Sequence, residues 1–240
     1  MSRKWPTLLL LALAELLGMA VWFSASAVVP QLSALWSLGD SGRAWLTISV
    51  QLGFVAGALG SAVFNLSDRV SARWLFAVCC LLAAASTAAI VAASGFSTVL
   101  LCRFLTGMFL AGVYPVGMKI MATWAREDRG LAIGLLIAAL TLGSAFPHLL
   151  NALGGVGTVG DWRVVLLETA SCAALGGLLA ALWVREGPYR TATPPFRWQE
   201  SWEILQQRNV LLANLGYLGH MWELYAMRSE ERRVGKECRL

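Results

Sequence analysis

The sequence predicts an all-α membrane protein, a bundle of six membrane-spanning helices followed by a truncated seventh helix. Of its 240 residues, 58% are hydrophobic and 14% are charged, whereas about a quarter of the residues in a soluble globular protein are charged. Six apolar runs fill residues 7 to 184, and each has roughly the 20 residues that a helix needs to cross a bilayer. A seventh apolar run begins near Asn209.

The six predicted spans follow one another with short connections. The first is too long for a cleaved signal peptide and lacks a small-residue cleavage site before a polar mature sequence. Pro115 and Pro147 are expected to bend the fourth and fifth spans. Two sets of glycines, 53, 57 and 60 and then 176 and 177, indicate close helix packing. The spans are 7–29, 44–66, 74–93, 98–122, 131–153 and 164–184, and together they make residues 1–184 one six-helix domain.

Lys and Arg residues predict how the chain crosses the membrane. Because cytoplasmic loops carry an excess of Lys and Arg, the richer side is assigned to the cytoplasm of a bacterial inner membrane, together with the N-terminus. The polar, proline-containing segment 185–208 lies on the same side and is interpreted as a cytoplasmic linker. The richer side has ten such residues, Arg3, Lys4, Arg69, Arg73, Arg126, Arg129, Arg185, Arg190, Arg197 and Arg208, against Arg43 and Arg163 on the other.

The chain changes character after Met227. The seventh span is predicted to cover residues 209–227 and to break there, because eight of the thirteen residues 228–240 are charged. Residues 228–239 resemble the translation of a common sequencing adapter. We therefore expect residues 228–240 to be a non-native tail, and a native basic tail after a short helix is the alternative.

Composition excludes several classes of function. The formal net charge is +5, of which the tail contributes +2, and the remaining basic residues lie in short loops, so nucleic acid is not expected as a partner. Cys79, Cys80, Cys102 and Cys172 lie in apolar runs without CxxC spacing or a histidine cluster, so the sequence predicts neither a disulfide framework nor a metal site. No nucleophile–base pair or phosphate-binding loop is present, so neither an enzyme nor a bound cofactor is expected.

Two motifs resemble those of the major facilitator superfamily. The loop after the second span, Asn65-Leu-Ser-Asp-Arg-Val-Ser-Ala-Arg73, resembles the Gly-x-Leu-Ala-Asp-Arg-x-Gly-Arg-Lys motif of that superfamily, with Asp68, Arg69 and Arg73 on matching positions. In the fourth span, Arg103 followed by Gly107 and Gly112 resembles the motif of the fourth helix. The resemblance implies a conformational role for the loop residues. It also implies a twelve-helix fold with alternating access, whose second six-helix half lies outside this chain.

A narrower resemblance concerns the stretch from Gly112 to Lys119, followed by Trp124 and Arg129-Gly130. It is similar to the nitrate/nitrite- or cyanate-transporter branch of the superfamily. The glycine-dense fifth helix of nitrate carriers is absent, because the fifth span has Gly134, Gly143 and Pro147 instead.

Ionisable residues inside the spans are the candidate site, because each costs about 2.5–3.5 kcal/mol on insertion scales and usually has a partner or a function. Glu15 and Lys119 lie toward the cytoplasmic side of the first and fourth spans, which line the cavity in the superfamily. We predict that they form an ion pair or a substrate and proton site. The alternatives are that Lys119 reaches to the membrane surface and that Glu15 binds neighbouring backbone.

Arg103 lies in the outer third of the fourth span, and His220 and Glu223 lie in the outer third of the seventh. These three are predicted to form a gate or an anion site, and a structural Arg103–Glu168 pair is the alternative. Other polar residues in the spans are candidates for substrate contact or for hydrogen bonds between helices: Gln51, Tyr114, Ser24, Ser26, Thr106 and Asn151.

The sequence therefore predicts part of a secondary active transporter in a lipid bilayer, with a small-molecule substrate, an anion, and protons as the coupling ion. A drug or multidrug efflux carrier of the same superfamily is one alternative, and a membrane protein of six or seven spans without transport activity is another. Because the substrate site of the superfamily lies between two six-helix halves, this chain is expected to be inactive by itself.

Overall fold

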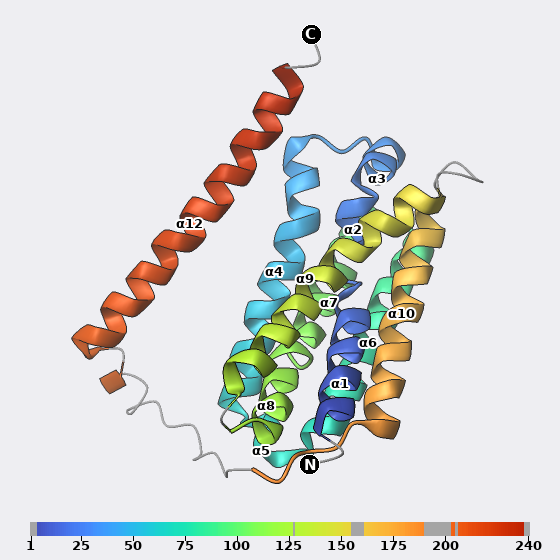
Figure 1. The fold of residues 1–240 in the computed structure, drawn as a ribbon. Coiled ribbons are helices and arrows are strands. Elements are labelled where there is room, and N and C mark those ends of the chain that lie inside the picture. Colours follow the sequence, from blue (N-terminus) through green and yellow to red (C-terminus); the bar gives the residue numbers. More distant parts are fainter. Residues whose placement is uncertain (1–3, 127, 155–160, 190–202, 205, 238–240) are drawn as a thin grey trace. The chain divides into compact units, whose positions relative to one another are not determined.

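The computed structural model describes residues 4–126, 128–154, 161–189, 203–204 and 206–237, without side chains at 153–154 and 224–237. All regular structure in these ranges is helical (Figure 1). The chain forms two compact units, residues 1–194 and 195–240. The first unit is a helical bundle, as the sequence predicts, and it contains most of the candidate site.

The first predicted span is not one continuous helix. α1 (Lys4–Met19) ends after 16 residues, residues 20–23 form turns, and the chain continues as α2 (Ser24–Ala27) and α3 (Val29–Trp36). The predicted span 7–29 thus includes residues of three helices. Residues 20–23 are apolar and include no glycine or proline that would have indicated the break. Carbonyl groups in the break accept hydrogen bonds from a side chain of another helix.

The second and third spans are close to their predicted bounds. They are α4 (Asp40–Val63) and α6 (Ala72–Ala89), which a short 3-10 helix, η1 (Ile90–Ala92), extends. Asn65, with a left-handed φ of 51°, follows the end of α4, and the one-turn α5 (Leu66–Arg69) carries the loop motif between them. This conformation suits asparagine better than most residues other than glycine.

The fourth span is bent, as Pro115 predicts. α7 (Phe96–Leu110) is followed by a turn at residues 111–113 and by α8 (Tyr114–Trp124), which has Pro115 in its first turn. Proline lacks a backbone N–H, so it is tolerated at a helix start but breaks an uninterrupted helix. The fourth span is therefore divided into two helices near its centre.

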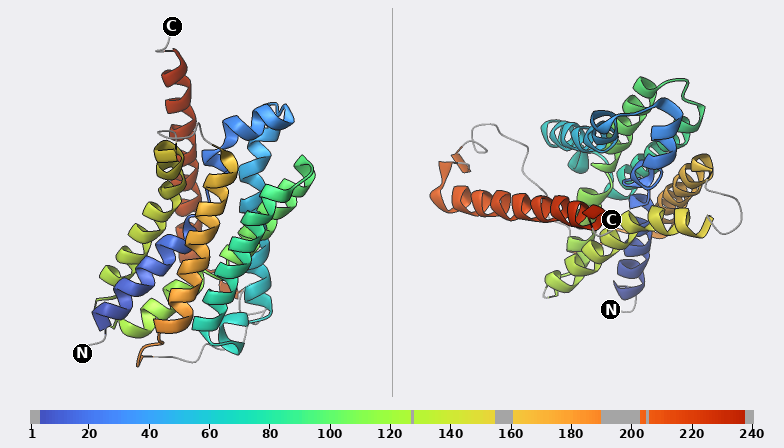
Figure 2. Two further views of the ribbon diagram at one scale, coloured as in Figure 1. Left: turned by 90° about the vertical axis from the view of Figure 1, so that its right-hand side faces the viewer. Right: turned by 90° about the horizontal axis from the view of Figure 1, so that it is seen from above.

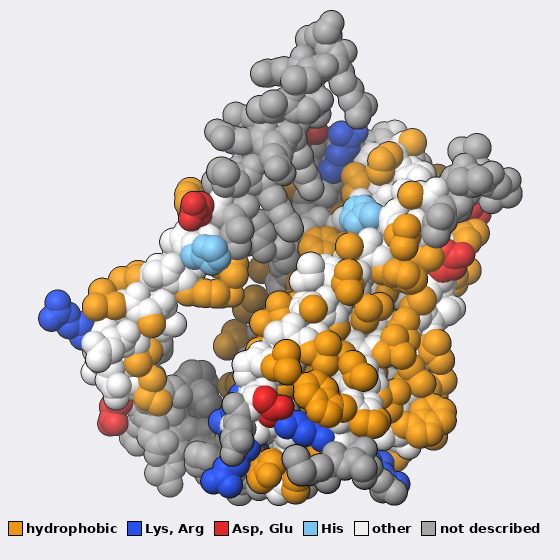
Figure 3. All heavy atoms as spheres, viewed as in Figure 1, with side chains coloured by type: hydrophobic (Ala, Val, Ile, Leu, Met, Phe, Trp, Pro, Cys, Tyr) orange, Lys and Arg blue, Asp and Glu red, His pale blue; other side chains and the backbone are white. Residues whose placement is uncertain are grey.

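The last two spans of the bundle are α9 (Arg129–Gly154), which contains Pro147, and α10 (Trp162–Trp183), which Asp161 caps by accepting a bond of 3.0 Å from the N–H of Arg163. α1, α6 and α10 pack side by side, as Figure 2 shows from two further directions. In Figure 3, hydrophobic side chains cover the flank of the bundle and Lys and Arg gather at its lower end. This distribution fits a bundle that is surrounded by lipid.

Glycines bring α4 and α7 into backbone contact. A Cβ atom on Gly53 would lie 1.9 Å from the carbonyl oxygen of Phe104, and one on Gly107 would lie 1.9 Å from that of Val50. Gly57 and Gly177 also lie against neighbouring helices, as predicted, but Gly60 has no atom within 4 Å of the corresponding position. The prediction of close packing is therefore wrong for Gly60.

Five helical segments in the described part of the chain are long and apolar enough to cross a membrane: Asp40–Val63, Ala72–Ala92, Phe96–Trp124, Arg129–Ala152 and Trp162–Trp183. Because of the break after Met19, α1 alone is shorter than these segments. The chain is thus a multi-pass membrane protein with the helices of a six-span bundle.

The second unit contains α12 (Arg208–Glu237). This helix includes the predicted span 209–227 and continues for ten residues beyond Met227, where we expected it to break. Glu, Lys and Arg are good helix formers, so their charge does not end a helix by itself. α12 is not among the five apolar segments, because Asn209, Asn214, His220 and Glu223 lower its hydropathy.

Candidate functional site

Arg103 is fully buried in α7 and binds backbone carbonyl groups of two other segments. Its guanidinium donates to the carbonyl oxygens of Val21 at 3.0 Å and Trp22 at 2.5 Å, and its Nε donates to that of Leu46 at 3.3 Å. The first two carbonyls belong to the break after α1, where the regular helical bonds end. The Val21 carbonyl also accepts from the Ser24 hydroxyl at 2.9 Å, and Arg103 supplies a donor to the Trp22 carbonyl.

The alternative of an Arg103–Glu168 pair is not formed. Glu168 is exposed on the surface of α10, and the three acceptors of Arg103 are all backbone oxygens. A carbonyl group that is buried in an apolar bundle without a donor costs free energy. This cost explains why the guanidinium turns toward the break.

Glu15 is fully buried on α1, and neither of its carboxyl oxygens has a hydrogen-bond partner among the described residues. The carboxyl group faces α8 at a glycine, because a Cβ atom on Gly117 would lie only 2.8 Å from Oε2 and 3.5 Å from the ring of Phe76. The absence of a larger side chain at Gly117 leaves room for the carboxyl group. The expected bond from Glu15 to neighbouring backbone is therefore not formed.

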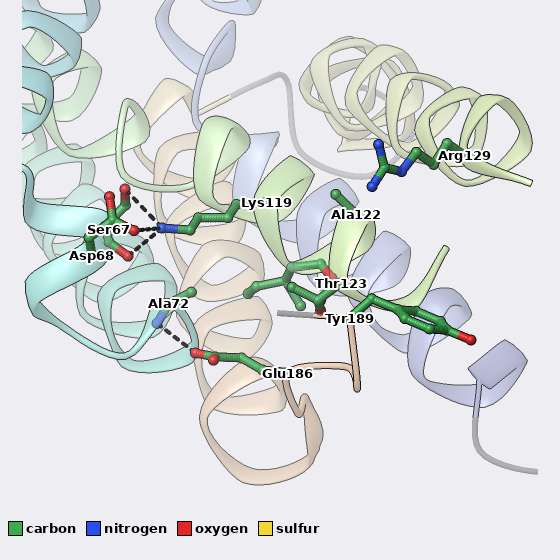
Figure 4. A pocket seen from close by; sticks show the side chains of 10 residues that line it. Ser67, Asp68, Ala72, Lys119, Ala122, Thr123, Arg129, Glu186 and Tyr189 are labelled. Carbon is green, nitrogen blue, oxygen red and sulfur yellow. Dashed lines mark hydrogen bonds and ion pairs between the residues drawn. The ribbon is translucent and has the colours of Figure 1, made fainter. Parts of the chain in front are cut away.

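Lys119 does not pair with Glu15. Its ammonium group donates to the carbonyl oxygen of Ser67 at 2.8 Å and binds the carboxylate of Asp68 (Figure 4). Lys119 and Glu15 were expected to pair because both lie toward the same end of their helices. The position along a helix does not determine in which direction around the helix axis a side chain points. Lys119 instead connects α8 to the loop motif, at the end of the bundle where the chain begins. This contact resembles the alternative in which Lys119 reaches toward the membrane surface.

The loop motif contributes different contacts from its three charged residues. Asp68 binds Lys119, and the Arg73 guanidinium lies 5.1 Å from the centre of the Trp74 ring. Arg69 is exposed. The conformational role that the resemblance implies for this loop stays a prediction, and Lys119 is an additional residue of the same cluster.

A cavity of about 250 Å³ lies beside this cluster, between α5, α8 and the segment after α10 (Figure 4). Glu186 accepts bonds from the Ala72 N–H at 3.0 Å and the Ser71 hydroxyl at 3.3 Å. The N–H groups of Gly187 and Tyr189 donate to Thr123, at 2.7 Å and 3.0 Å. The first residues of the predicted linker 185–208 thus bind the bundle, while residues 190–202 and 205 of the linker lie outside the described part.

Glu186 was not among the predicted site residues, because it follows the sixth span in a segment that was interpreted as a linker. Its position just before Gly187 and Pro188, which favour a turn, could have indicated that the chain folds back onto the bundle there. At the same end of the bundle, both carboxylate oxygens of Asp128 lie 2.7 Å from the Lys4 ammonium. The hydrogen bond from Lys4 holds the pKa of Asp128 below its ordinary value.

Most of the polar candidates inside the spans make hydrogen bonds between or within helices. The Asn151 amide donates to the carbonyl oxygen of Ala27 at 2.9 Å, and the hydroxyl groups of Ser26 and Thr47 lie 3.3 Å apart. Ser24 and Thr106 donate to carbonyls of their own segments. Gln51 and Tyr114 are half-buried, and their contact with a substrate stays a prediction.

His220 and Glu223 are exposed on α12, in the second unit. Their proposed gate with Arg103 stays a prediction. No group of three or more His, Cys, Asp or Glu residues that could hold a metal ion occurs among the residues whose positions are described.

Several curated proteins are similar to this chain. The niacin transporter NiaP of Acinetobacter baylyi is 32% identical over 125 residues, which are 47% of this chain and 28% of that protein. Synaptic vesicle glycoprotein 2A of Rattus norvegicus is 27% identical over 243 aligned residues, or 93% of this chain and 31% of that protein. The chain thus spans about a third or less of the length of these relatives.

Two solved transporters share the fold. A bacterial homologue of the human lysosomal transporter Spinster, inward-facing and unoccupied, aligns with a TM-score of 0.66 and 20% identity over 85% of this chain and 48% of its own. The proton:xylose symporter XylE, bound to 6-bromo-6-deoxy-D-glucose, aligns with a TM-score of 0.60 and 18% identity over 75% of this chain and 44% of its own.

The family assignment rests on the whole bundle and the start of α12. Residues 8–227 match the sequence profile described as Major Facilitator Superfamily. This range contains both motifs on which the resemblance was based and all of the apolar segments. The chain belongs to the Major Facilitator Superfamily.

Proposed function

We propose that the chain is the N-terminal half of a secondary transporter that moves a small solute by alternating access, with protons as the coupling ion. The observation that carries the proposal is the carboxyl group of Glu15, fully buried in the bundle without a hydrogen-bond partner among the described residues. An ionised carboxylate in such surroundings is strongly unfavourable. The neutral carboxylic acid is the form that fits, and a change of conformation that opens this region to water would release its proton.

The substrate proposal rests partly on relatives. The names of a niacin transporter and a proton:xylose symporter support a small organic solute and, for the second, protons. The resemblance of residues 112–119 to the nitrate/nitrite- or cyanate-transporter branch supports an anion. Arg103 and Lys119 bind oxygen atoms of the protein in this conformation, so an anion would meet either cation only after these bonds change. Gln51 and Tyr114 are the proposed first contacts.

The proposed carrier needs a second six-helix half, because this chain covers 48% and 44% of the two structures that share its fold. We propose a bacterial inner membrane as its location. The N-terminus would be in the cytoplasm, since the end of the bundle with Lys4 and Arg185 is the basic one.

Transport assays test the proposal. We expect the 240-residue chain alone to give no flux above empty vesicles. The complete gene product, read beyond the codon for Met227, should accumulate solute when a proton gradient is imposed. Glu15→Gln in the complete carrier keeps the shape of the neutral acid and should leave exchange of labelled for unlabelled solute intact, while accumulation driven by the proton gradient falls at least about tenfold.

Exposed Glu168 provides the control, since Glu168→Gln should leave both activities unchanged. Equal loss of exchange and accumulation in Glu15→Gln would contradict proton coupling at Glu15. Saturable flux by the chain alone would contradict the need for a second half.

A further inference from the structure

The helices of the first and fourth spans both break near the middle of the bundle, and the two breaks share their local geometry. In the first break, residues 20–23, the N–H groups of Ala20, Trp22 and Ser24 bond three residues back, at 3.3, 3.0 and 3.5 Å. In the second break, residues 111–113, Gly112 and Val113 do the same, at 2.8 and 3.0 Å. Short 3-10 stretches of this kind inside a longer helix often mark hinges.

The two breaks touch each other. A Cβ atom on Gly18, just before the first break, would lie 3.4 Å from Cγ1 of Val113 in the second break. Met19, Val21, Leu110 and Val113 belong to one buried cluster. A shift of one break therefore changes the packing of the other.

Two further contacts hold the same pair of segments on either side of this point. Arg103, before the second break, donates to the carbonyls of Val21 and Trp22 inside the first break. Glu15, before the first break, lies against Gly117 beyond the second. α1 and the α7–α8 segment run in opposite directions, so three contacts follow one another along them. Glu15 lies against Gly117, Gly18 against Val113, and Val21 and Trp22 against Arg103.

Two adjacent cysteines of α6 lie against a glycine at each break. The Sγ atom of Cys80 would be 3.0 Å from a Cβ on Gly18, and the Sγ atom of Cys79 would be only 2.3 Å from a Cβ on Gly112. Neighbouring residues of a helix point about 100° apart, so one turn of α6 packs against both breaks at once. A Cβ atom at Gly112 requires the Cys79 side chain to move, and one at Gly18 requires a smaller shift of the Cys80 side chain.

We propose that residues 20–23 and 111–113 form one coupled hinge, with Cys79 and Cys80 of α6 as its pivot. The hinge lets the outer parts of the first and fourth spans move together relative to their inner parts. The coupling is a property of the bundle and is measurable without a substrate. Its use in alternating access rests on the proposed function above.

Amide hydrogen exchange of the purified chain in lipid nanodiscs, read by mass spectrometry, tests this proposal. Gly112→Ala places a Cβ against Cys79 and should speed exchange by about tenfold in peptides of the second break and also in peptides of residues 20–24. Gly112→Ala combined with Cys79→Ala, which removes the Sγ atom, should bring both breaks back toward the parent rate. Gly60→Ala is the matched control, since no atom lies within 4 Å of its Cβ position, and should change neither break.

The reciprocal variant guards against misfolding of Gly112→Ala. Gly18→Ala creates milder contacts, at 3.0 and 3.4 Å, and should speed exchange at residues 111–113 as well as in its own break, because coupling between two sites is mutual. Faster exchange that stays within the substituted break, in either variant, would overturn the coupled hinge. If these variants left transport by the complete carrier unchanged, the result would contradict the use of the hinge in transport and not the coupling of the two breaks.

Discussion

Arg103→Met is expected to lower the free energy of unfolding of the bundle by about 1–3 kcal/mol. The substitution keeps an apolar side chain of similar length but removes all three hydrogen bonds to the carbonyls of Val21, Trp22 and Leu46. The carbonyl of Val21 keeps the hydroxyl of Ser24 as a donor, and that of Leu46 lies within α4. The Trp22 carbonyl loses the bond from Arg103, and a buried carbonyl without its donor costs about 1–3 kcal/mol, because in a membrane no water replaces the lost donor. The first break therefore depends on a side chain of another helix.

Arg103→Lys should fall between Met and the parent, because an ammonium group is a compact point charge and cannot span three acceptors with the fixed fork of a guanidinium. Unfolding by a titrated denaturing detergent, followed by circular dichroism, measures the difference. Arg43→Met is the matched control. Arg43 is about half exposed and makes a long salt bridge of 3.6 Å, which is worth about 0–1 kcal/mol. An Arg103→Met variant as stable as the Arg43→Met variant would contradict the role assigned to Arg103.

Gly53→Ala should destabilise the bundle and Gly60→Ala should not, although both glycines lie on α4. The Cβ atom added at Gly53 would lie 1.9 Å from the carbonyl oxygen of Phe104 and 3.0 Å from the N–H nitrogen of Met108. These are backbone atoms, so α4 and α7 must separate. Overpacking typically costs about 1–3 kcal/mol and occasionally more, and a backbone clash falls at the upper end.

At Gly60 the added methyl group meets no atom within 4 Å, and alanine is a better helix former than glycine by about 1 kcal/mol. Gly60→Ala should therefore be neutral or more stable than the parent. The same detergent titration compares the two variants. If both destabilised the bundle equally, the assigned contact between α4 and α7 would be incorrect.

The sequence predicts the fold class because apolar length alone marks most of the crossing segments. Pro115 also indicates the second break, since a proline inside a helix removes a hydrogen bond. The first break was not predictable in the same way. Residues 20–23 are Ala-Val-Trp-Phe, and their departure from a helix depends on Arg103, which is 81 residues away from Trp22 in the chain.

The residue types of the candidate site could be predicted from the sequence, but the partners of those residues could not. Charged residues in apolar spans are few, so Glu15, Arg103 and Lys119 stand out from composition. Their partners depend on the rotation of each helix about its axis, which neither depth nor spacing determines. The space that Gly117 leaves for Glu15 and the cap that Glu186 provides for α6 are likewise products of tertiary packing.

The central claim is that Glu15 is a neutral carboxylic acid enclosed by the bundle. Infrared difference spectroscopy of the purified chain in lipid tests it most directly. We predict a carbonyl band of a protonated carboxylic acid that persists at neutral pH, disappears in Glu15→Gln and is unchanged in Glu168→Gln. Identical spectra for the parent and Glu15→Gln in that region would mean that Glu15 is ionised, and would contradict the proposed proton site.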